Sequence, residues 1–218
     1  ERLPHPRDVL YRPAYQEAIE HIQELYAAAG FGRAVVGPVQ FAEVDDGVHV
    51  VIPVDEGPRT HLFRLSIEGN ELFTTAEVAE LLDLEAGMPF SRGIFEAARK
   101  RLVDAYAERG YLFALVEGSI ALSEDETRAN LDIVIRERFP VRVGGIEIHG
   151  AERTRTSLIR YLILLEVGEA YRPSVARRTQ ERLMALGVFR RVAISIKDPE
   201  LPERVKIVED NVAEHKNQ

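Results

Sequence analysis

Three stretches of this 218-residue chain share one pattern, and their repetition constrains the fold more than any other feature. Each has apolar residues at helical spacing and ends on a glycine that an apolar residue follows. Such a glycine adopts the left-handed conformation that ends a helix. The stretches are 14–29, 95–109 and 174–186, and they end at Gly30, Gly110 and Gly187, which are 80 and 77 residues apart. This period predicts tandem repeats.

Two strands joined by a polar turn follow each of these glycines. In the middle copy they span 112–122 and 128–136, and Leu131, Ile133 and Ile135 alternate with Asp132, Val134 and Arg136. The first copy offers strands at 34–41 and 48–54 around the turn Asp45-Asp46-Gly47, and the third offers 190–197 and 204–208. Alternation with period two predicts antiparallel hairpins that bury one face.

Two of the copies carry a further strand and a shorter helix ahead of the main helix. The strands lie around 63–67 and 143–148, and the short helices span 75–82 and 156–165. Gly69 and Gly150, which end these strands, are 81 residues apart. The unit is therefore βααββ, and the predicted class is α+β, with a three-stranded mixed sheet and two helices on one face of each repeat.

These patterns predict the following domains: a partial repeat over 1–58, truncated at its N-terminus; a complete repeat over 59–139; a second complete repeat over 140–211; and a tail over 212–218. The connections between them, at 56–59 and 138–141, are very short. We therefore expect neighbouring repeats to touch rather than to tumble freely.

The position of Pro38 suggests which strand lies at the edge of each sheet. It interrupts the first hairpin strand of the first copy, and proline is confined to edge strands or bulges. We therefore expect the first hairpin strand to be the open edge and the closing strand to be central. The candidate partner-binding residues on these edges are Ala34, Val36, Leu112, Ala114, Val116, Val192 and Ile194.

The charge of the chain argues against nucleic acid as a partner. Its net charge is −8, whereas binding to a phosphate backbone needs clustered positive charge. Only residues 141–218 are net positive, with 14 basic and 11 acidic side chains. These basic residues either coat solvated surfaces or face an anionic membrane or an acidic partner. The candidates for the second role are Arg177, Arg178, Arg182, Arg190 and Arg191.

The sequence offers no catalytic or cofactor motif. It has no cysteine, and its six histidines are scattered without metal-ligand spacing. Gly30-Phe31-Gly32 follows a helix rather than a strand and lacks the third glycine, which argues against a dinucleotide fingerprint. We therefore expect no enzyme activity, no cofactor and no metal. The polar segment Glu1–Leu10 does not resemble a signal peptide, and no apolar run approaches the ~20 residues of a membrane helix.

Three motifs at equivalent points of the repeat resemble the POTRA family. They are Gly69-Asn70 after the first strand, Gly87-Met88-Pro89-Phe90 before the main helix, and Tyr106 to Tyr111 at its end. The third copy resembles the last repeat before a membrane barrel, although Ala151 stands where the family usually has Asn. The resemblance implies a periplasmic arm of a BamA/TamA-type assembly protein attached to the outer membrane.

The same resemblance implies the partners. They are unfolded outer-membrane client proteins taken up by strand addition, accessory lipoproteins of the assembly complex, and a C-terminal membrane barrel of the same chain. Three alternatives stay open within or near this class: a TamA-like transporter, a two-partner secretion transporter and a division-protein-like interaction module. An RNA-binding module of the KH kind lacks its Gly-x-x-Gly loop here.

Overall fold

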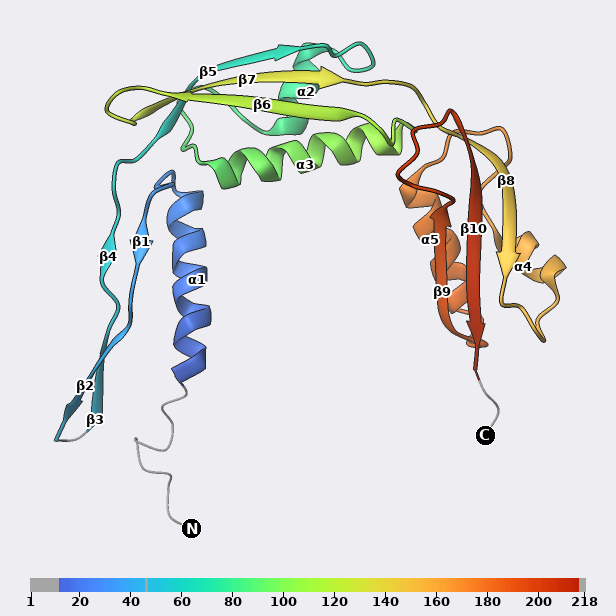
Figure 1. Ribbon diagram of the computed structural model, residues 1–218, viewed down its shortest axis with the longest axis horizontal. Helices are drawn as coiled ribbons and strands as arrows, with labels where there is room; N and C mark the ends of the chain where they lie inside the picture. The colour runs from blue at the N-terminus through green and yellow to red at the C-terminus, as the bar shows by residue number, and fades with distance from the viewer. Residues whose placement is uncertain (1–11, 46, 216–218) are drawn as a thin grey trace. The chain divides into compact units, whose positions relative to one another are not determined.

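The computed structural model describes residues 12–45 and 47–215 (Figure 1). Glu1–Leu10 and Asp46, which enter predictions above, lie outside these residues. The chain forms two compact units that divide the middle repeat between them. The first comprises 1–68, 75–100 and 117–134, and the second comprises 69–74, 101–116 and 135–218.

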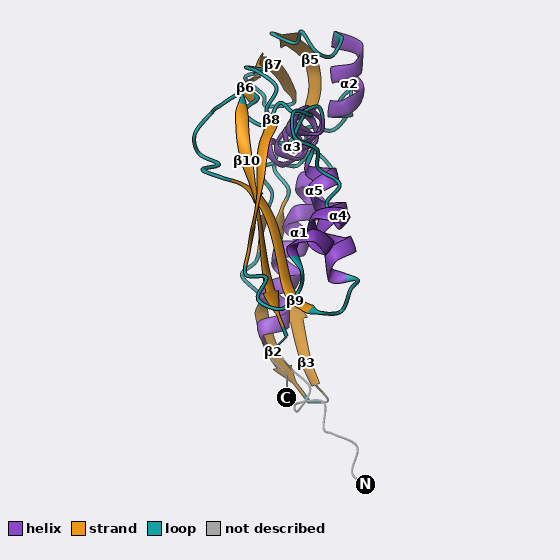
Figure 2. Ribbon diagram, turned by 90° about the vertical axis from the view of Figure 1, so that its right-hand side faces the viewer, coloured by secondary structure: helices purple, strands orange, loops and turns teal. Residues whose placement is uncertain are grey.

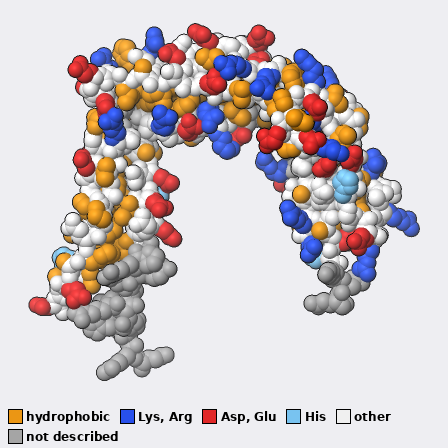
Figure 3. Space-filling view, viewed as in Figure 1, with side chains coloured by type: hydrophobic (Ala, Val, Ile, Leu, Met, Phe, Trp, Pro, Cys, Tyr) orange, Lys and Arg blue, Asp and Glu red, His pale blue; other side chains and the backbone are white. Residues whose placement is uncertain are grey.

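The middle repeat has the predicted βααββ order. Its elements are β5 (His61–Glu68), α2 (Thr75–Leu82), α3 (Arg92–Glu108), β6 (Leu115–Leu122) and β7 (Arg128–Arg136). The closing strand β7 is central, between β5 and β6, and it runs parallel to β5. The prediction of a central closing strand is therefore confirmed. Hydrophobic side chains fill the seam between this sheet and α3 (Figure 3).

The third repeat has the same topology. Its elements are β8 (Arg142–His149), α4 (Thr156–Leu162), α5 (Pro173–Met184), β9 (Phe189–Ile196) and β10 (Val205–Glu214). Strand β10 is central, parallel to β8 and antiparallel to β9. Both helices lie on one face of this sheet (Figure 2). The tandem α+β repeat architecture is therefore confirmed.

Strand β10 is longer than the predicted 204–208 and reaches Glu214. Every second residue from Lys206 to Val212 is buried, and this series includes Asp210. A charged residue at a buried position breaks the apolar alternation on which the prediction rested. Asp210 lies among apolar residues of the sheet, and both of its carboxylate oxygens lack a hydrogen-bond partner among the described residues.

The first repeat consists of α1 (Arg12–Ala28) and two short ladders. Strand β1 (Val35–Val36) pairs with β4 (Val54–Asp55), and β2 (Gln40–Val44) pairs with β3 (Gly47–Val51). The predicted single strands 34–41 and 48–54 are thus each split in two. Prolines at 38 and 53 cause this, because proline cannot donate a ladder hydrogen bond.

Candidate functional site

The clearest unpaired edge of the third repeat is strand β9. The Lys197 N–H donates to the Ile207 carbonyl at 2.8 Å, so the main-chain groups of Lys197 point toward β10. Because these directions alternate along an antiparallel strand, the N–H and C=O groups of Val192, Ile194 and Ile196 point away from β10. Within the described chain, no strand pairs with β9 on that side. The Val192 side chain is buried in the core, so at this position the edge presents main-chain hydrogen-bonding groups rather than a side chain to a partner.

In the first repeat, the structure separates the two predicted edge residues. The Gly37 N–H donates to the Pro53 carbonyl at 2.8 Å, so the main-chain groups of Val36 point away from β4. Ala34 lies ahead of β1, and its main chain is already engaged. Its N–H donates to the Phe31 carbonyl, and its own carbonyl accepts from Gln23 Nε2 at 3.3 Å.

In the middle repeat, two of the three predicted edge residues lie outside the strand. Strand β6 begins at Leu115, because the residues between α3 and Leu115 form a hydrogen-bonded turn. Leu112 N–H donates to the Gly110 carbonyl and Ala114 N–H to the Tyr111 carbonyl, at 3.0 and 3.2 Å. The Leu112 side chain packs against the apolar cluster of the third repeat. Val116 lies on β6, with its side chain buried.

Successive repeats meet through main-chain hydrogen bonds, which we call the joints. At the first joint the Thr60 N–H donates to the Gly30 carbonyl of the first repeat at 2.9 Å, and the Thr60 carbonyl accepts the Phe90 N–H of its own repeat at 2.9 Å. The second joint repeats both bonds 80 or 81 residues later, at 2.8 and 2.9 Å, among Gly110, Val141 and Tyr171. The short connections therefore produce contact between neighbours, as expected.

The second joint also has a carboxylate that caps a helix of the next repeat. Glu108, the last residue of α3, accepts the Ser174 N–H at 2.8 Å and the Ser174 hydroxyl at 2.5 Å. Ser174 lies in the first turn of α5, where main-chain N–H groups lack partners within the helix. A carboxylate there also interacts favourably with the helix dipole. The corresponding position at the first joint is Ala28.

Replacing Glu108 with alanine should therefore weaken the start of α5. We expect a loss of about 1–2 kcal/mol in the local stability of its first turn, as for other N-cap deletions. Hydrogen exchange of the Ser174 amide measures this directly and should accelerate by roughly 5- to 30-fold. Lys100→Ala, in the same helix α3, is the control, and equal exchange in the two variants would contradict the assignment.

The five predicted basic residues do not form one patch. Arg177, Arg178 and Arg182 are exposed on α5, whose buried residues face the sheet. Arg191 neighbours the buried Val192 on β9, so it points to the sheet face away from the helices. Arg190 is exposed at the start of the same strand. Lys and Arg side chains are accordingly spread along the third repeat (Figure 3).

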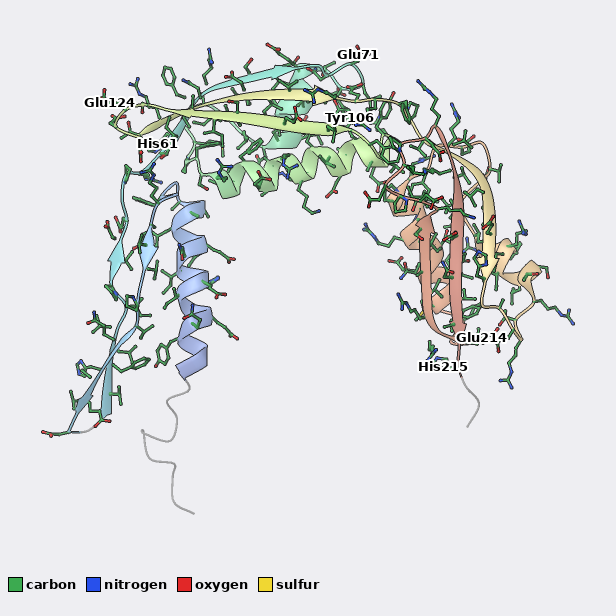
Figure 4. All side chains as sticks on the ribbon, viewed as in Figure 1. His61, Glu71, Tyr106, Glu124, Glu214 and His215 are labelled. Carbon is green, nitrogen blue, oxygen red and sulfur yellow. The ribbon has the colours of Figure 1, made fainter. Side chains whose placement is uncertain are left out.

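One carboxylate in each complete repeat ties the end of the closing strand to the loop after the opening strand. Glu137 accepts the main-chain N–H groups of Glu71 and Leu72 at 2.6 and 2.8 Å and the Tyr106 hydroxyl at 2.8 Å. Figure 4 labels Glu71 and Tyr106 at this end of the middle repeat. Burial, together with this bond, raises the Tyr106 pKa. Sequence reasoning missed this role, although the 77-residue spacing of Glu137 and Glu214 was a usable signal.

In the third repeat Glu214 plays the same part. It accepts the main-chain N–H groups of Arg153 and Thr154, the latter at 2.8 Å, and these hydrogen bonds lower its pKa. No tyrosine completes this site, because Leu183 occupies the position that corresponds to Tyr106. Both carboxylates act on the backbone of their own repeat, which is a structural role.

A second group of charged residues lies on the outer face of the third sheet. Glu147, His149 and Glu209 could each offer a ligand atom, and these atoms lie within 4.8 Å of one another. The Lys197 ammonium lies 3.5 Å from Glu147 and 4.0 Å from Glu209, so the chain provides its own cation there.

Across the described residues, no helix combines the length and apolarity needed to cross a membrane.

Comparison with known proteins now identifies the fold family. The family described as "POTRA: Surface antigen variable number repeat" matches residues 63–138 and 141–212, which is more than half of the chain. This chain belongs to the POTRA family. The two matches coincide with the middle and third repeats, and the first repeat lies outside them.

Two similar relatives are both outer membrane protein assembly factor BamA. The protein from Nitratidesulfovibrio vulgaris is 26% identical over 190 residues, covering 84% of this chain and 24% of the relative. The protein from Neorickettsia risticii is 26% identical over 175 residues, covering 79% and 23%. This POTRA chain therefore spans about a quarter of the length of the curated relatives it matches.

Solved structures support the fold. The Haemophilus influenzae BamA POTRA3-5 structure has a TM-score of 0.67 at 22% identity and covers 92% of this chain and 80% of its own. Haemophilus ducreyi BamA lacking POTRA domains 1-3 has a TM-score of 0.59 at 18% identity, with coverage of 72% and 29%. At these identities the likeness concerns the POTRA fold alone.

Proposed function

We propose that this chain is part of the periplasmic scaffold of an outer-membrane β-barrel assembly protein, and that it takes up unfolded client strands at its sheet edges. The observation that carries the proposal is the row of outward-pointing main-chain groups on β9. The relatives' identity as outer membrane protein assembly factors supports the assembly role. The proposed activity is binding without catalysis or cofactor.

Edge binding of this kind should be weak and tolerant of sequence. A client strand of five residues forms about five main-chain hydrogen bonds, each worth roughly 0.5–1.5 kcal/mol net. Ordering the same segment costs about 1–2 kcal/mol per residue. The two contributions nearly cancel, so a client is held briefly and released. Such binding suits transfer of a client to the membrane better than its storage.

The remaining parts of the proposal concern partners and boundaries. We assign accessory lipoproteins and a membrane barrel of the same chain as further partners. The repeats are assigned to 1–58, 59–139 and 140–211, except that β10 continues to Glu214, so the third repeat extends beyond 211. We propose that the basic residues of α5 contact an anionic surface. The client site is the separate edge strand β9.

Hydrogen exchange with a client peptide tests strand addition at β9. An excess of a synthetic peptide copied from a transmembrane strand of an outer-membrane protein should slow exchange at the Val192, Ile194 and Ile196 amides by at least fivefold. The amide of Lys197 already donates within the sheet and should change little. Uniform protection, or protection confined to other elements while the peptide binds, would refute the edge mechanism.

A proline variant supplies the matched control for this experiment. Ile194→Pro removes an outward-pointing N–H without removing a ladder hydrogen bond, so the sheet should persist and peptide protection should disappear. Ser195→Pro removes an N–H that points toward β10 and should destabilise the sheet itself. Peptide protection at β9 that survives in Ile194→Pro would count against the proposal.

A further inference from the structure

The third repeat has an apolar groove between the start of α4 and the turn after α5. It has a volume of about 640 Å³, and Leu158, Leu186 and Val188 form its apolar wall. Their side chains are 45%, 37% and 43% exposed, which is high for large apolar residues. Thr154, Arg155 and Ser157 complete the lining.

The middle repeat shows how the same place is filled in this fold. Counted from Gly69 and Gly150, Thr154 corresponds to Phe73, which is buried. The Phe73 ring packs edge-on against Tyr106 at 5.0 Å between centroids, and the Arg109 guanidinium lies 5.3 Å from its centre. The corresponding residues of the third repeat are Leu183 and Leu186. The third repeat therefore lacks both the ring and the cation that covers it.

The two leucines of the apolar wall are also particular to the third repeat. Leu158 corresponds to Glu77 and Leu186 to Arg109, so the middle repeat places charged residues where the third places leucines. Arg155 lines the groove, and Arg160 lies on α4 two residues beyond Leu158; both arginines are exposed. Neither forms an ion pair with any residue that the structure describes.

We propose that this groove binds a segment of a partner protein that inserts a phenylalanine and carries acidic residues next to it. The inserted ring takes the place that Phe73 fills in the middle repeat, and it buries the exposed leucines. The acidic residues pair with Arg155 and Arg160, which gives charge complementarity and orients the segment. This site lies on helix α4 and the turn after α5, so it is distinct from the β9 edge and independent of client binding there.

A synthetic 12-residue peptide with one central phenylalanine flanked by aspartate and glutamate tests the inference on the full chain. We expect micromolar to sub-millimolar binding by fluorescence anisotropy, and NMR shifts concentrated on the methyl groups of Leu158, Leu186 and Val188. Replacing the peptide phenylalanine with alanine should weaken binding at least tenfold. Replacing its acidic residues with lysine should weaken binding at least fivefold.

Variants that introduce the middle repeat's residues at equivalent positions of the third repeat should fold normally, so they test the groove without the complication of misfolding. Thr154→Phe should fill the groove with the chain's own ring, and Leu158→Glu with Leu186→Arg should replace the apolar wall. Each of these residue types stands at the equivalent position of the same fold, and each variant should weaken the peptide at least tenfold. Leu201→Glu, an exposed apolar residue in the turn between β9 and β10, should leave binding unchanged.

Several results would overturn the inference. They are absence of binding at millimolar peptide, unchanged affinity in Thr154→Phe, and shifts that map to another surface. Self-association of the chain on sedimentation that Thr154→Phe abolishes would assign the groove to a second copy instead. Binding to anionic phosphatidylglycerol vesicles that the same variant abolishes would assign it to a membrane surface. Either outcome would replace the partner protein as occupant.

Discussion

Replacing Asp210 with valine should raise the free energy of unfolding of the third repeat by about 3 kcal/mol at pH 7. Asp210 is 1% exposed, and neither carboxylate oxygen has a partner among the described residues. Burial raises its pKa from 3.8 to about 6. A difference of roughly two pH units between unfolded and folded states corresponds to about 3 kcal/mol. The middle repeat has Ile133 at the equivalent position, so an apolar residue fits this fold.

The sign of the pH dependence follows from the raised pKa. Between pH 4 and pH 6 the folded chain holds the Asp210 proton while the unfolded chain has lost it. The third repeat should therefore lose stability as pH rises through this window, with the full loss reached above pH 6. In Asp210→Val this contribution should vanish.

Urea denaturation of both proteins at several pH values between 4 and 7.5 measures the effect. Asp210→Asn is the informative companion, because it removes the charge and keeps a polar group of the same size. It should flatten the pH dependence and restore less stability than valine does. If the two variants and the original chain shared one pH profile, the carboxyl would not be the source of the instability.

Replacing Gly69 with alanine should destabilise the middle repeat by about 3 kcal/mol or more. Gly69 has a φ of 82°, and an added Cβ would lie 2.1 Å from the Ile135 carbonyl oxygen. Conformation alone accounts for about 1–2 kcal/mol, and the clash forces the loop away from the end of β7. Gly150 is in the same situation against the Val212 carbonyl oxygen, so Gly150→Ala should have a similar effect on the third repeat.

Gly87 offers a control that separates conformation from contact. Its φ of 92° is just as unfavourable for alanine, but no atom lies within 4 Å of an added Cβ. Gly87→Ala should therefore cost only about 1–2 kcal/mol, the conformational part. Thermal or urea unfolding of the two variants tests the difference, and equal losses would show that the contact with Ile135 is relieved by a local shift.

Much of the fold could be predicted because its signals are local. Helical spacing with closing glycines located the main helices, and Pro38 pointed to the edge strand. Asp210 was the exception, since a buried charge hid the second half of β10 from a search for apolar alternation. The late start of β6 could not be predicted either. Leu112 extends the apolar pattern of the strand in the sequence, but its side chain packs against the neighbouring repeat.

The candidate surfaces were harder to predict than the fold. Pattern analysis named Val36, Val116, Val192 and Ile194, which lie on edge strands, but also Ala34, Leu112 and Ala114, which turns and contacts engage. The arginines of α5 and Arg191 of β9 are close in sequence but lie on different sides of the sheet, which the burial pattern of β9 reveals. The groove depends on the difference between Phe73 and Thr154. The sequence shows this difference, but only the structure shows that Phe73 is buried and that Thr154 lines a groove.

The two joints share their main-chain contact and differ in their side chains. At both joints the hydrogen bond between repeats joins main-chain atoms. Side chains add to it, since Arg59 Nε donates to the Ala29 carbonyl at the first joint and Glu108 accepts from Ser174 at the second. Glu108 and Leu112 make contacts that the first joint lacks, because the corresponding residues there are Ala28 and Gly32.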